Sequence, residues 1–246
     1  MPLGYSGVIA SAQAAEWQDT ASYEQWFETS LGRAYAASVS STVRPWIEKV
    51  EPGLVVDVGC GPGITAASVL PSRTRLVELD CTFAMARRAY ARLGAEGRDV
   101  RSVVGACSEI PLASGVADLI LCVNCLEFVE DRQAAFRELG RVLAKGGTAV
   151  VGVLNVESPW ELTRRIRAPF MRDNGTYYRN ARFFRARELR EDLEGAGFDV
   201  REVVFAVHFP PFRSPVSSFY RACERSLGRW MPGRGAMILA RAVARA

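Results

Sequence analysis

The chain is poor in several features that metalloproteins and membrane proteins depend on. Its 246 residues include a single histidine, His208, and two lysines, Lys49 and Lys145. A structural zinc site at the C-x-x-C pair Cys122 and Cys125 would need two further ligands, so no metal site is expected. No apolar run approaches the roughly 20 residues of a membrane-spanning helix, so no transmembrane segment is expected.

The charge balance gives little support to a nucleic-acid partner. The formal net charge is +4, and nearly all of the basic residues are arginines. A mild excess of scattered arginines is typical of a solvated surface, so no nucleic-acid partner is expected. The Ala12-Gln13-Ala14 stretch has no basic start before it, which argues against a signal peptide, and residues 1–15 are expected to form a floppy leader. We therefore expect a cytoplasmic protein with six reduced cysteines.

The segment VVDVGCGPGI, from Val55 to Ile64, is the most informative in the chain. A short apolar run ending in Asp57 predicts a buried strand of a parallel sheet, and the glycines after it predict a tight turn into a helix near Ile64. Such a loop is where open α/β sheets bind ligands. The G-x-G-x-G spacing differs from the dinucleotide pattern G-x-G-x-x-G. An acid beside the glycines suits a cationic ligand, such as S-adenosylmethionine with its ammonium and sulfonium.

Five segments in order resemble the class I S-adenosylmethionine-dependent methyltransferases, in their small-molecule, type-11-like branch. VVDVGCGPG resembles the first motif, and LVELDCTFAMARRA (residues 76–89) resembles the second. Residues 105–131, 135–155 and 183–203 resemble the later segments. The resemblance implies a Rossmann-like, doubly wound α/β fold. Its sheet would have seven strands in the order 3-2-1-4-5-7-6, with an antiparallel last strand, N-terminal helices and a lid insertion after strand 5.

The resemblance also implies which residues bind the cofactor, S-adenosyl-L-methionine. Asp80 takes the position that binds both ribose hydroxyls. The family usually has an acid at position 106, where it meets the adenine amine, but this chain has Ala106, so adenine recognition would fall to Cys107 or Ser108. The predicted cofactor-binding residues are Asp57, Gly59, Cys60, Gly61, Gly63, Asp80, Cys81, Ala106, Cys107, Ser108, Asn124, Tyr23 and Arg33.

We predict a single domain, 1–246, with four parts. These are an N-terminal helical cap (1–50), a cofactor-binding core (51–155), a lid insertion (156–187) and a C-terminal part with the edge strands (188–246). The detailed pattern predicts helices over 16–29, from about 33 to Pro45, from Asp131 to about 144, and over 217–230. Gly146-Gly147 should stop the third of these helices, and strands should cover 200–208 and 236–243.

Three residues are candidates for the base that a protonated nucleophile would need. Glu127 follows the fourth predicted strand, although a carboxylate there can also cap a turn. His208 ends the sixth, although a lone histidine on a strand is more often structural. Tyr23 lies in a segment that resembles an element closing over the cofactor, where Arg33 would meet the cofactor's carboxylate. Tyr23, Trp26 and Phe27 equally fit the core-facing stripe of an amphipathic helix.

Cys122 and Cys125 admit two interpretations. C-x-x-C spacing can mark a redox pair. On a strand, however, residues i and i+3 point to opposite faces, which favours two small buried side chains.

The sequence thus predicts a methyltransferase that acts on a small-molecule or lipid-like acceptor. The alternatives are a non-catalytic S-adenosylmethionine-binding or scaffold protein of the same fold, an RNA methyltransferase and an NAD-dependent dehydrogenase. Aromatic residues from Trp160 to Trp230, interleaved with arginines such as Arg164 and Arg165, favour an apolar pocket with a cationic rim. The other interpretation is that these aromatics form a small core of their own. The sequence does not indicate the oligomeric state.

Overall fold

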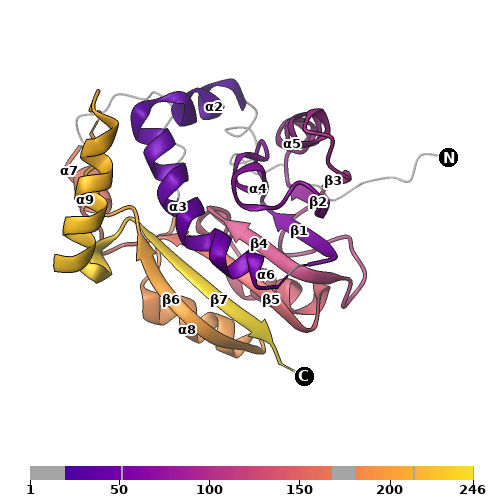
Figure 1. The fold of residues 1–246 in the computed structure, drawn as a ribbon. Helices are drawn as coiled ribbons and strands as arrows, with labels where there is room; N and C mark the ends of the chain where they lie inside the picture. The colour runs from indigo at the N-terminus through magenta and orange to yellow at the C-terminus, as the bar shows by residue number, and fades with distance from the viewer. Residues whose placement is uncertain (1–19, 51, 168–180, 213, 246) are drawn as a thin grey trace.

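One mixed sheet organises the part of the chain that the computed structural model describes, which is residues 20–50, 52–167, 181–212 and 214–245. Its order is β3-β2-β1-β4-β5-β7-β6 (Figure 1). The strands are β1 (Leu54–Val58), β2 (Arg75–Asp80), β3 (Val100–Val104), β4 (Ala117–Val123), β5 (Leu143–Leu154), β6 (Phe198–Ala206) and β7 (Met237–Ala244). β1 to β5 pair in parallel, whereas β7 is antiparallel to β5 and β6. The predicted fold class and strand order are confirmed.

Helices cover both faces of this sheet (Figure 1). The helices are α2 (Thr20–Glu28), α3 (Ser30–Glu48), α4 (Ile64–Val69), α5 (Phe83–Ala95), α6 (Arg132–Val142), α7 (Pro159–Arg167), α8 (Ala186–Gly195) and α9 (Ser217–Trp230), with short 3₁₀ turns η1 (Leu126–Phe128) and η3 (Pro232–Arg234). In the described residues, no helix is both long and apolar enough to cross a membrane.

Two apolar clusters pack on opposite faces of the sheet because strand side chains alternate in direction. Val55 belongs to the cluster that contains buried residues of α3 and α4, and Val56 belongs to the cluster beneath α6 and α8. Phe136 of α6 and Leu189 of α8 are fully buried in the second cluster. Since β1 is covered on both sides, its position in the centre of the sheet is fixed by burial.

A sharp corner joins α2 to α3. Thr29 caps α3 by accepting a hydrogen bond from the amide of Gly32, at 3.0 Å. A Cβ at Gly32 would overlap the backbone of Trp26, so only glycine fits this corner. The predicted helix end near Pro45 is wrong, since α3 continues to Glu48. Pro45 lies in the last turn, where its missing N–H removes one hydrogen bond while the following Trp46 remains buried against the core.

Two further predicted element boundaries differ from the structure. α6 ends at Val142, and Leu143 is already extended, with φ −73° and ψ 136°. Gly146-Gly147 therefore do not stop the helix. They lie within β5 at a shift in its pairing with β4, where Leu143 pairs with Ala117 and Thr148 with Leu119. β6 ends at Ala206, since the next residue, Val207, has a φ of +65°.

The predicted leader, residues 1–15, lies outside the described residues, as does the central part of the predicted lid, 168–180. The described flanks of that insertion pack on the rest of the fold. The ring of Trp160 in α7 lies 6.0 Å from that of Tyr35 in α3, and Phe184 is fully buried beside the end of β5. The division into cap, core, lid and C-terminal part stays a prediction.

Candidate functional site

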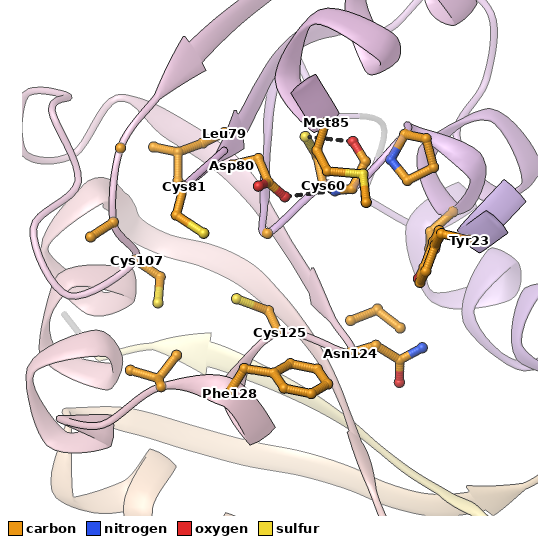
Figure 2. A pocket seen from close by; sticks show the side chains of 18 of the residues that line it. Tyr23, Cys60, Leu79, Asp80, Cys81, Met85, Cys107, Asn124, Cys125 and Phe128 are labelled. Atoms are coloured by element: carbon orange, nitrogen blue, oxygen red, sulfur yellow. Dashed lines mark hydrogen bonds between the residues drawn. The ribbon is translucent and has the colours of Figure 1, made fainter. Parts of the chain in front are cut away.

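A cavity of about 340 Å³ opens at the carboxyl ends of β1, β2 and β4 (Figure 2). This is the edge of a doubly wound sheet where ligands bind. Apolar and sulfur-containing side chains dominate its wall, and Asp80 lies near its centre. The lining residues are Tyr23, Phe27, Gly59, Cys60, Gly61, Pro62, Ile64, Thr65, Leu79, Asp80, Cys81, Met85, Gly105, Ala106, Cys107, Ser108, Val123, Asn124, Cys125, Phe128, Val129, Glu130 and Asp131.

The turn after β1 forms one wall of this cavity. The amides of Gly59 and Cys60 both donate to the carbonyl of Leu79, at 2.8 and 3.0 Å, which folds the turn over the end of β2. Gly59 has a φ of +71°, and a Cβ there would overlap the side chain of Cys125, so glycine is required on both counts. At Gly61 the added Cβ would meet open space, with Tyr23 Cε1 nearest at 3.9 Å. A ligand can therefore approach the backbone at Gly61.

Asp80 joins the ends of β1 and β2 at the cavity. Its Oδ2 accepts a hydrogen bond from the amide of Gly61 at 3.0 Å, as Figure 2 shows. Its Oδ1 accepts from the amide and the hydroxyl of Thr82, at 2.9 and 3.1 Å. Burial raises the pKa of Asp80, and these hydrogen bonds partly offset that rise. The thiol of Cys81 also donates a hydrogen bond to this carboxylate, so a ligand hydroxyl would replace or share one of these donors.

Asp57 lies behind the cavity wall. It is 2% exposed and does not line the cavity. Its partner across the pairing of β1 with β2 is Glu78, which is fully buried. Burial, together with the charge of Asp80, raises the pKa of Asp57 to about 8. Burial and the nearby Asp57 likewise raise the pKa of Glu78. The predicted direct contact between Asp57 and a cationic ligand therefore has no support from the geometry.

Gly63 also lies outside the cavity lining. It precedes α4 with a φ of +76°, and a Cβ there would lie 3.1 Å from Cα of Ala89 in α5. Gly63 thus allows the helix after the turn to pack closely against α5.

Cysteine side chains line the cavity to an unusual extent. Figure 2 shows the sulfur atoms of Cys60, Cys81, Cys107 and Cys125 around it, while Cys122 is buried behind it. Burial raises the pKa of Cys81 to about 12, so this thiol stays protonated. Within the described ranges, no group of histidine, cysteine or acidic residues could hold a metal ion.

The alternation argument for the C-x-x-C pair is wrong. β4 ends at Val123, and Asn124 adopts a left-handed conformation, with φ +56°. This reversal turns the chain, so Cys125 points back toward both Cys122 and Cys107 and interacts with their thiols. The contact with Cys107 lowers the pKa of Cys125, but the contact with Cys122 and desolvation outweigh it and raise this pKa well above its usual value, which is typical of an unreactive thiol.

The loop after β3 and the turn after β4 meet at the end of the cavity opposite Tyr23. The cavity is lined there by three of the predicted cofactor-binding residues, Ala106, Cys107 and Ser108, and their contact with adenine stays a prediction. The sequence analysis missed the residues from Phe128 to Asp131, which also line it. Glu130 and Asp131 bring carboxylates to this cavity, whereas the loop after β3 has no carboxylate at position 106, where Ala106 lies. The two adjacent acids in the sequence Val129-Glu130-Asp131, shortly after the fourth predicted strand, could have indicated these positions.

Aromatic side chains from α2 form the other end of the cavity. Tyr23 and Phe27 both line it, with their ring centroids 5.3 Å apart. Asn124 faces the cavity as well, and its Nδ2 donates to the hydroxyl oxygen of Tyr35 at 2.8 Å. Its backbone amide donates to the carbonyl of Gly152 at 2.9 Å, which fixes Asn124 between β4 and β5.

The structure does not bring the other three predicted residues to the cavity. Glu127 is fully buried, and its Oε1 accepts from the amide of Leu154 at 2.6 Å. The ring of His208 contacts the carboxylate of Glu224 at 3.2 Å and the carbonyl of Pro232 at 3.0 Å. Arg33 is exposed, and its guanidinium donates to the carbonyl of Glu28. Of the three candidate bases, Tyr23 alone lines the described cavity.

Comparison with known families places the chain among methyltransferases. The family model described as "Methyltransferase domain" matches residues 56–151, which contain the glycine turn, Asp80 and Asn124. An uncharacterized protein of Mycobacterium tuberculosis is 33% identical over 201 residues, or 81% of this chain. That match spans 65% of the length of the mycobacterial protein.

A second sequence relative agrees in family, and a solved structure agrees in fold. The malonyl-[acyl-carrier protein] O-methyltransferase of Geobacter sulfurreducens is 31% identical over 202 residues, covering 77% of this chain and 74% of the relative. The crystal structure of a S-adenosylmethionine-dependent methyltransferase of Thermotoga maritima, a possible histamine N-methyltransferase, superposes with a TM-score of 0.68. That match has 22% identity and covers 95% of this chain and all of the other. The chain belongs to the class I S-adenosylmethionine-dependent methyltransferases, and its cofactor is S-adenosyl-L-methionine.

Proposed function

We propose that this protein transfers a methyl group from S-adenosylmethionine to a small-molecule or lipid-like acceptor. One observation carries the proposal. Asp80 is anchored to the glycine turn by the amide of Gly61, and it lines a cavity that is otherwise mostly apolar. This arrangement places a buried carboxylate beside an open stretch of backbone, which suits a ligand with a ribose hydroxyl.

The residues around the cavity fit this cofactor. We propose that Asp80 holds the ribose, that the backbone from Gly59 to Gly61 lies along the amino-acid portion, and that Cys81 and Cys107 contact the base. When bound, S-adenosylmethionine supplies a methyl group that is already activated by its sulfonium. The acceptor's nucleophile must then lie in line with that methyl group, and orientation of this kind contributes roughly 7–11 kcal/mol.

The chain's own contribution is alignment and exclusion of water. Tyr23 and Phe27 close one end of the cavity with aromatic rings, and Asn124 is held rigidly by Tyr35. A fixed amide at the end of β4 can orient a polar group of the acceptor. We assign Tyr23 as the residue that contacts the acceptor, because its ring lines the cavity, and its phenolate form would take up the proton of a nucleophile that carries one.

The described cavity does not support a cationic rim. Its charged lining residues are Asp80, Glu130 and Asp131, and no described arginine or lysine lines it. Arg164 and Arg165 instead pair with the buried Glu161 of their own helix.

Most of the described late aromatics also have a structural role. Their rings contact one another in sequence and join α3, α7 and α9; they are Tyr35, Trp160, Phe209, Tyr220, Phe219 and Phe212. Predicted lid residues 168–180, which include Phe170, Met171, Tyr177 and Tyr178, lie outside the described residues.

We therefore propose an acceptor with an apolar body. The Geobacter relative is named for a carrier-bound malonyl group and the Thermotoga structure for a possible small amine, which supports a small acceptor and not a nucleic acid. We further propose that the protein acts in the cytoplasm.

A two-part experiment tests the function. Thermal shift with S-adenosylmethionine, S-adenosylhomocysteine and NAD should show stabilisation by the first two compounds alone, because a ligand stabilises the state that binds it. A screen of acceptors with labelled S-adenosylmethionine should then show transfer by the natural sequence and much less by Asp80→Ala at subsaturating cofactor. Cofactor binding without any transfer would favour the scaffold alternative, transfer to RNA would favour the RNA methyltransferase, and stabilisation by NAD alone would favour the dehydrogenase.

A further inference from the structure

Helix α9 presents a row of arginines to solvent. Arg221, Arg225 and Arg229 recur at intervals of four residues, and all three are exposed. Residues at this spacing lie on one face of a helix, so the three cations form a single row. The acidic residue of this helix, Glu224, points to the other side, where it contacts His208 and Ser38. Figure 1 shows α9 at the outer flank of the molecule.

This row differs from the exposed arginines of α8. On α8, Arg187 and Arg190 each form an ion pair with a glutamate four residues later, Glu191 and Glu194. Such alternation of sign is typical of a solvated helix face. In the described residues, no carboxylate pairs with the three arginines of α9. Like charges at this spacing repel, so the row lowers the stability of the isolated helix.

Exposed apolar side chains lie at both ends of the arginine row. Trp230, the last residue of α9, has 88% of its surface exposed, and the adjoining Met231 is exposed as well. At the amino end, Phe212 and Val216 are exposed. The helix of 14 residues is about 21 Å long, and these apolar groups flank it in sequence at its two ends.

We propose that this face of α9 docks on the surface of an anionic phospholipid bilayer. The arginines would meet lipid phosphates, while Trp230 and Met231 at one end, and Phe212 and Val216 at the other, enter the headgroup region. Tryptophan is favoured at this interface because its ring is amphipathic, and arginine keeps its charge in the headgroup layer. Such docking is separate from the proposed methyl transfer, and it would bring the protein to a surface where a lipid-like acceptor is found.

A bilayer fits this surface better than an acidic protein or RNA does. Either of those partners would account for the cations, but neither requires an exposed tryptophan and methionine at the end of the row. The inward face of α9 packs on the fold through Tyr220, which is buried, so the helix would lie on the bilayer without inserting into it. Attachment of this type is reversible and weakens as salt screens the charges.

Vesicle co-sedimentation tests the proposal directly. The protein is mixed with vesicles of phosphatidylcholine alone and of phosphatidylcholine with phosphatidylglycerol, at physiological and at raised ionic strength. We expect the protein to sediment with the anionic vesicles, and raised salt should reverse this binding. Replacing all three arginines by Gln (R221Q/R225Q/R229Q) should weaken partitioning about 100-fold, given the contribution of each basic residue near an anionic surface.

A matched variant separates the row from net charge. Arg73, Arg101 and Arg137 are exposed and distant in sequence from α9, and R73Q/R101Q/R137Q removes the same charge. This variant should sediment like the natural sequence. In a second measurement, quenching of tryptophan emission by brominated acyl chains should fall in Trp230→Phe. Circular dichroism confirms that each variant is folded.

Three results would overturn the proposal. The first is equal sedimentation with neutral and anionic vesicles. The second is equal loss in the two triple variants. The third is binding of RNA or an acidic carrier protein through the same arginines with no sedimentation on vesicles. None of these results depends on cofactor binding, so failure of the docking proposal leaves the proposed methyl transfer intact.

Discussion

The carboxylate of Glu127 accepts a hydrogen bond from the backbone amide of Leu154, with Oε1 2.6 Å from the nitrogen. This bond ties the turn after β4 to the last residue of β5. Burial raises the pKa of Glu127 to about 7, and no hydrogen bond reaches its Oε2 from the described residues. The position of Glu127 indicates that it stabilises the end of the sheet, on which Asn124 and Phe128 are mounted.

Glu127→Gln should therefore retain methyl transfer within about threefold, whereas loss of a true general base lowers rates by about 10²–10⁴. Because the folded pKa is raised, the natural protein loses stability as pH rises from about 4.5 through 7. This loss amounts to roughly 3 kcal/mol at most, and the Gln variant should lack it. Glu127→Ala should cost about 1–3 kcal/mol by leaving an unpaired amide. Urea unfolding at several pH values and labelled-methyl assays measure both effects.

Asp57 and Glu78 give a second pH dependence. Both carboxyls have raised pKa values, that of Asp57 being about 8, so the folded state holds protons that the unfolded chain releases above about pH 4. Stability should thus fall between pH 4 and 8. Glu78→Gln removes one acid of the pair, and the fall should become smaller by at least about 1.4 kcal/mol, the equivalent of one pKa unit. Parallel pH profiles for the variant and the natural protein would contradict this account.

Asp80→Ala should weaken S-adenosylmethionine binding by about 1.5–3 kcal/mol, the range for a hydrogen bond to a charged group. Isothermal titration calorimetry measures the affinity. Asp118→Ala is the matched control, because Asp118 also accepts a backbone amide, that of Leu54 at 2.8 Å, but does not line the cavity. The control should bind the cofactor normally. Equal affinity in both variants would remove Asp80 from the cofactor site.

His208→Ala should reduce stability and leave turnover per folded molecule unchanged. Burial lowers the pKa of His208. Its hydrogen bonds to Glu224 and to the carbonyl of Pro232 raise the pKa by a larger amount, so the net value lies above the usual one. Its contribution is therefore fully present below about pH 6.5 and is lost as pH rises through the folded pKa. The variant should be destabilised more at pH 6 than at pH 9. A selective fall in kcat at constant stability would instead support a catalytic role.

The resemblance to a known family predicted the order of the strands. Short apolar runs, glycines and the strand–helix alternation predicted the parallel sheet and the turn around Gly59, because these features depend on local signals. The same reasoning located Asp80 at a strand end, and the structure places it at the cavity.

The direction of individual side chains was much harder to predict. Asp57 and Glu127 also lie at strand ends, yet both point into the protein interior, because the outcome depends on the twist of the chain after each strand. The positive φ of Asn124 redirected Cys125, and a non-glycine residue gives little warning of this conformation. Phe128 and Val129 reach the cavity through the same turn.

The corner at Gly32 limits how ligands can enter. The backbone of Trp26 lies against Gly32, so α2 and α3 cannot bend independently at this point. At its other side, α2 is held by Glu24, which forms ion pairs with Arg88 and Arg92 of α5. The helix that carries Tyr23 and Phe27 is thus held at two places, at the Gly32 corner and at Glu24. We expect release of the Glu24 ion pairs to ease passage beneath this helix, so substitutions at Arg88 or Arg92 should change the exchange rate of the cofactor without touching it.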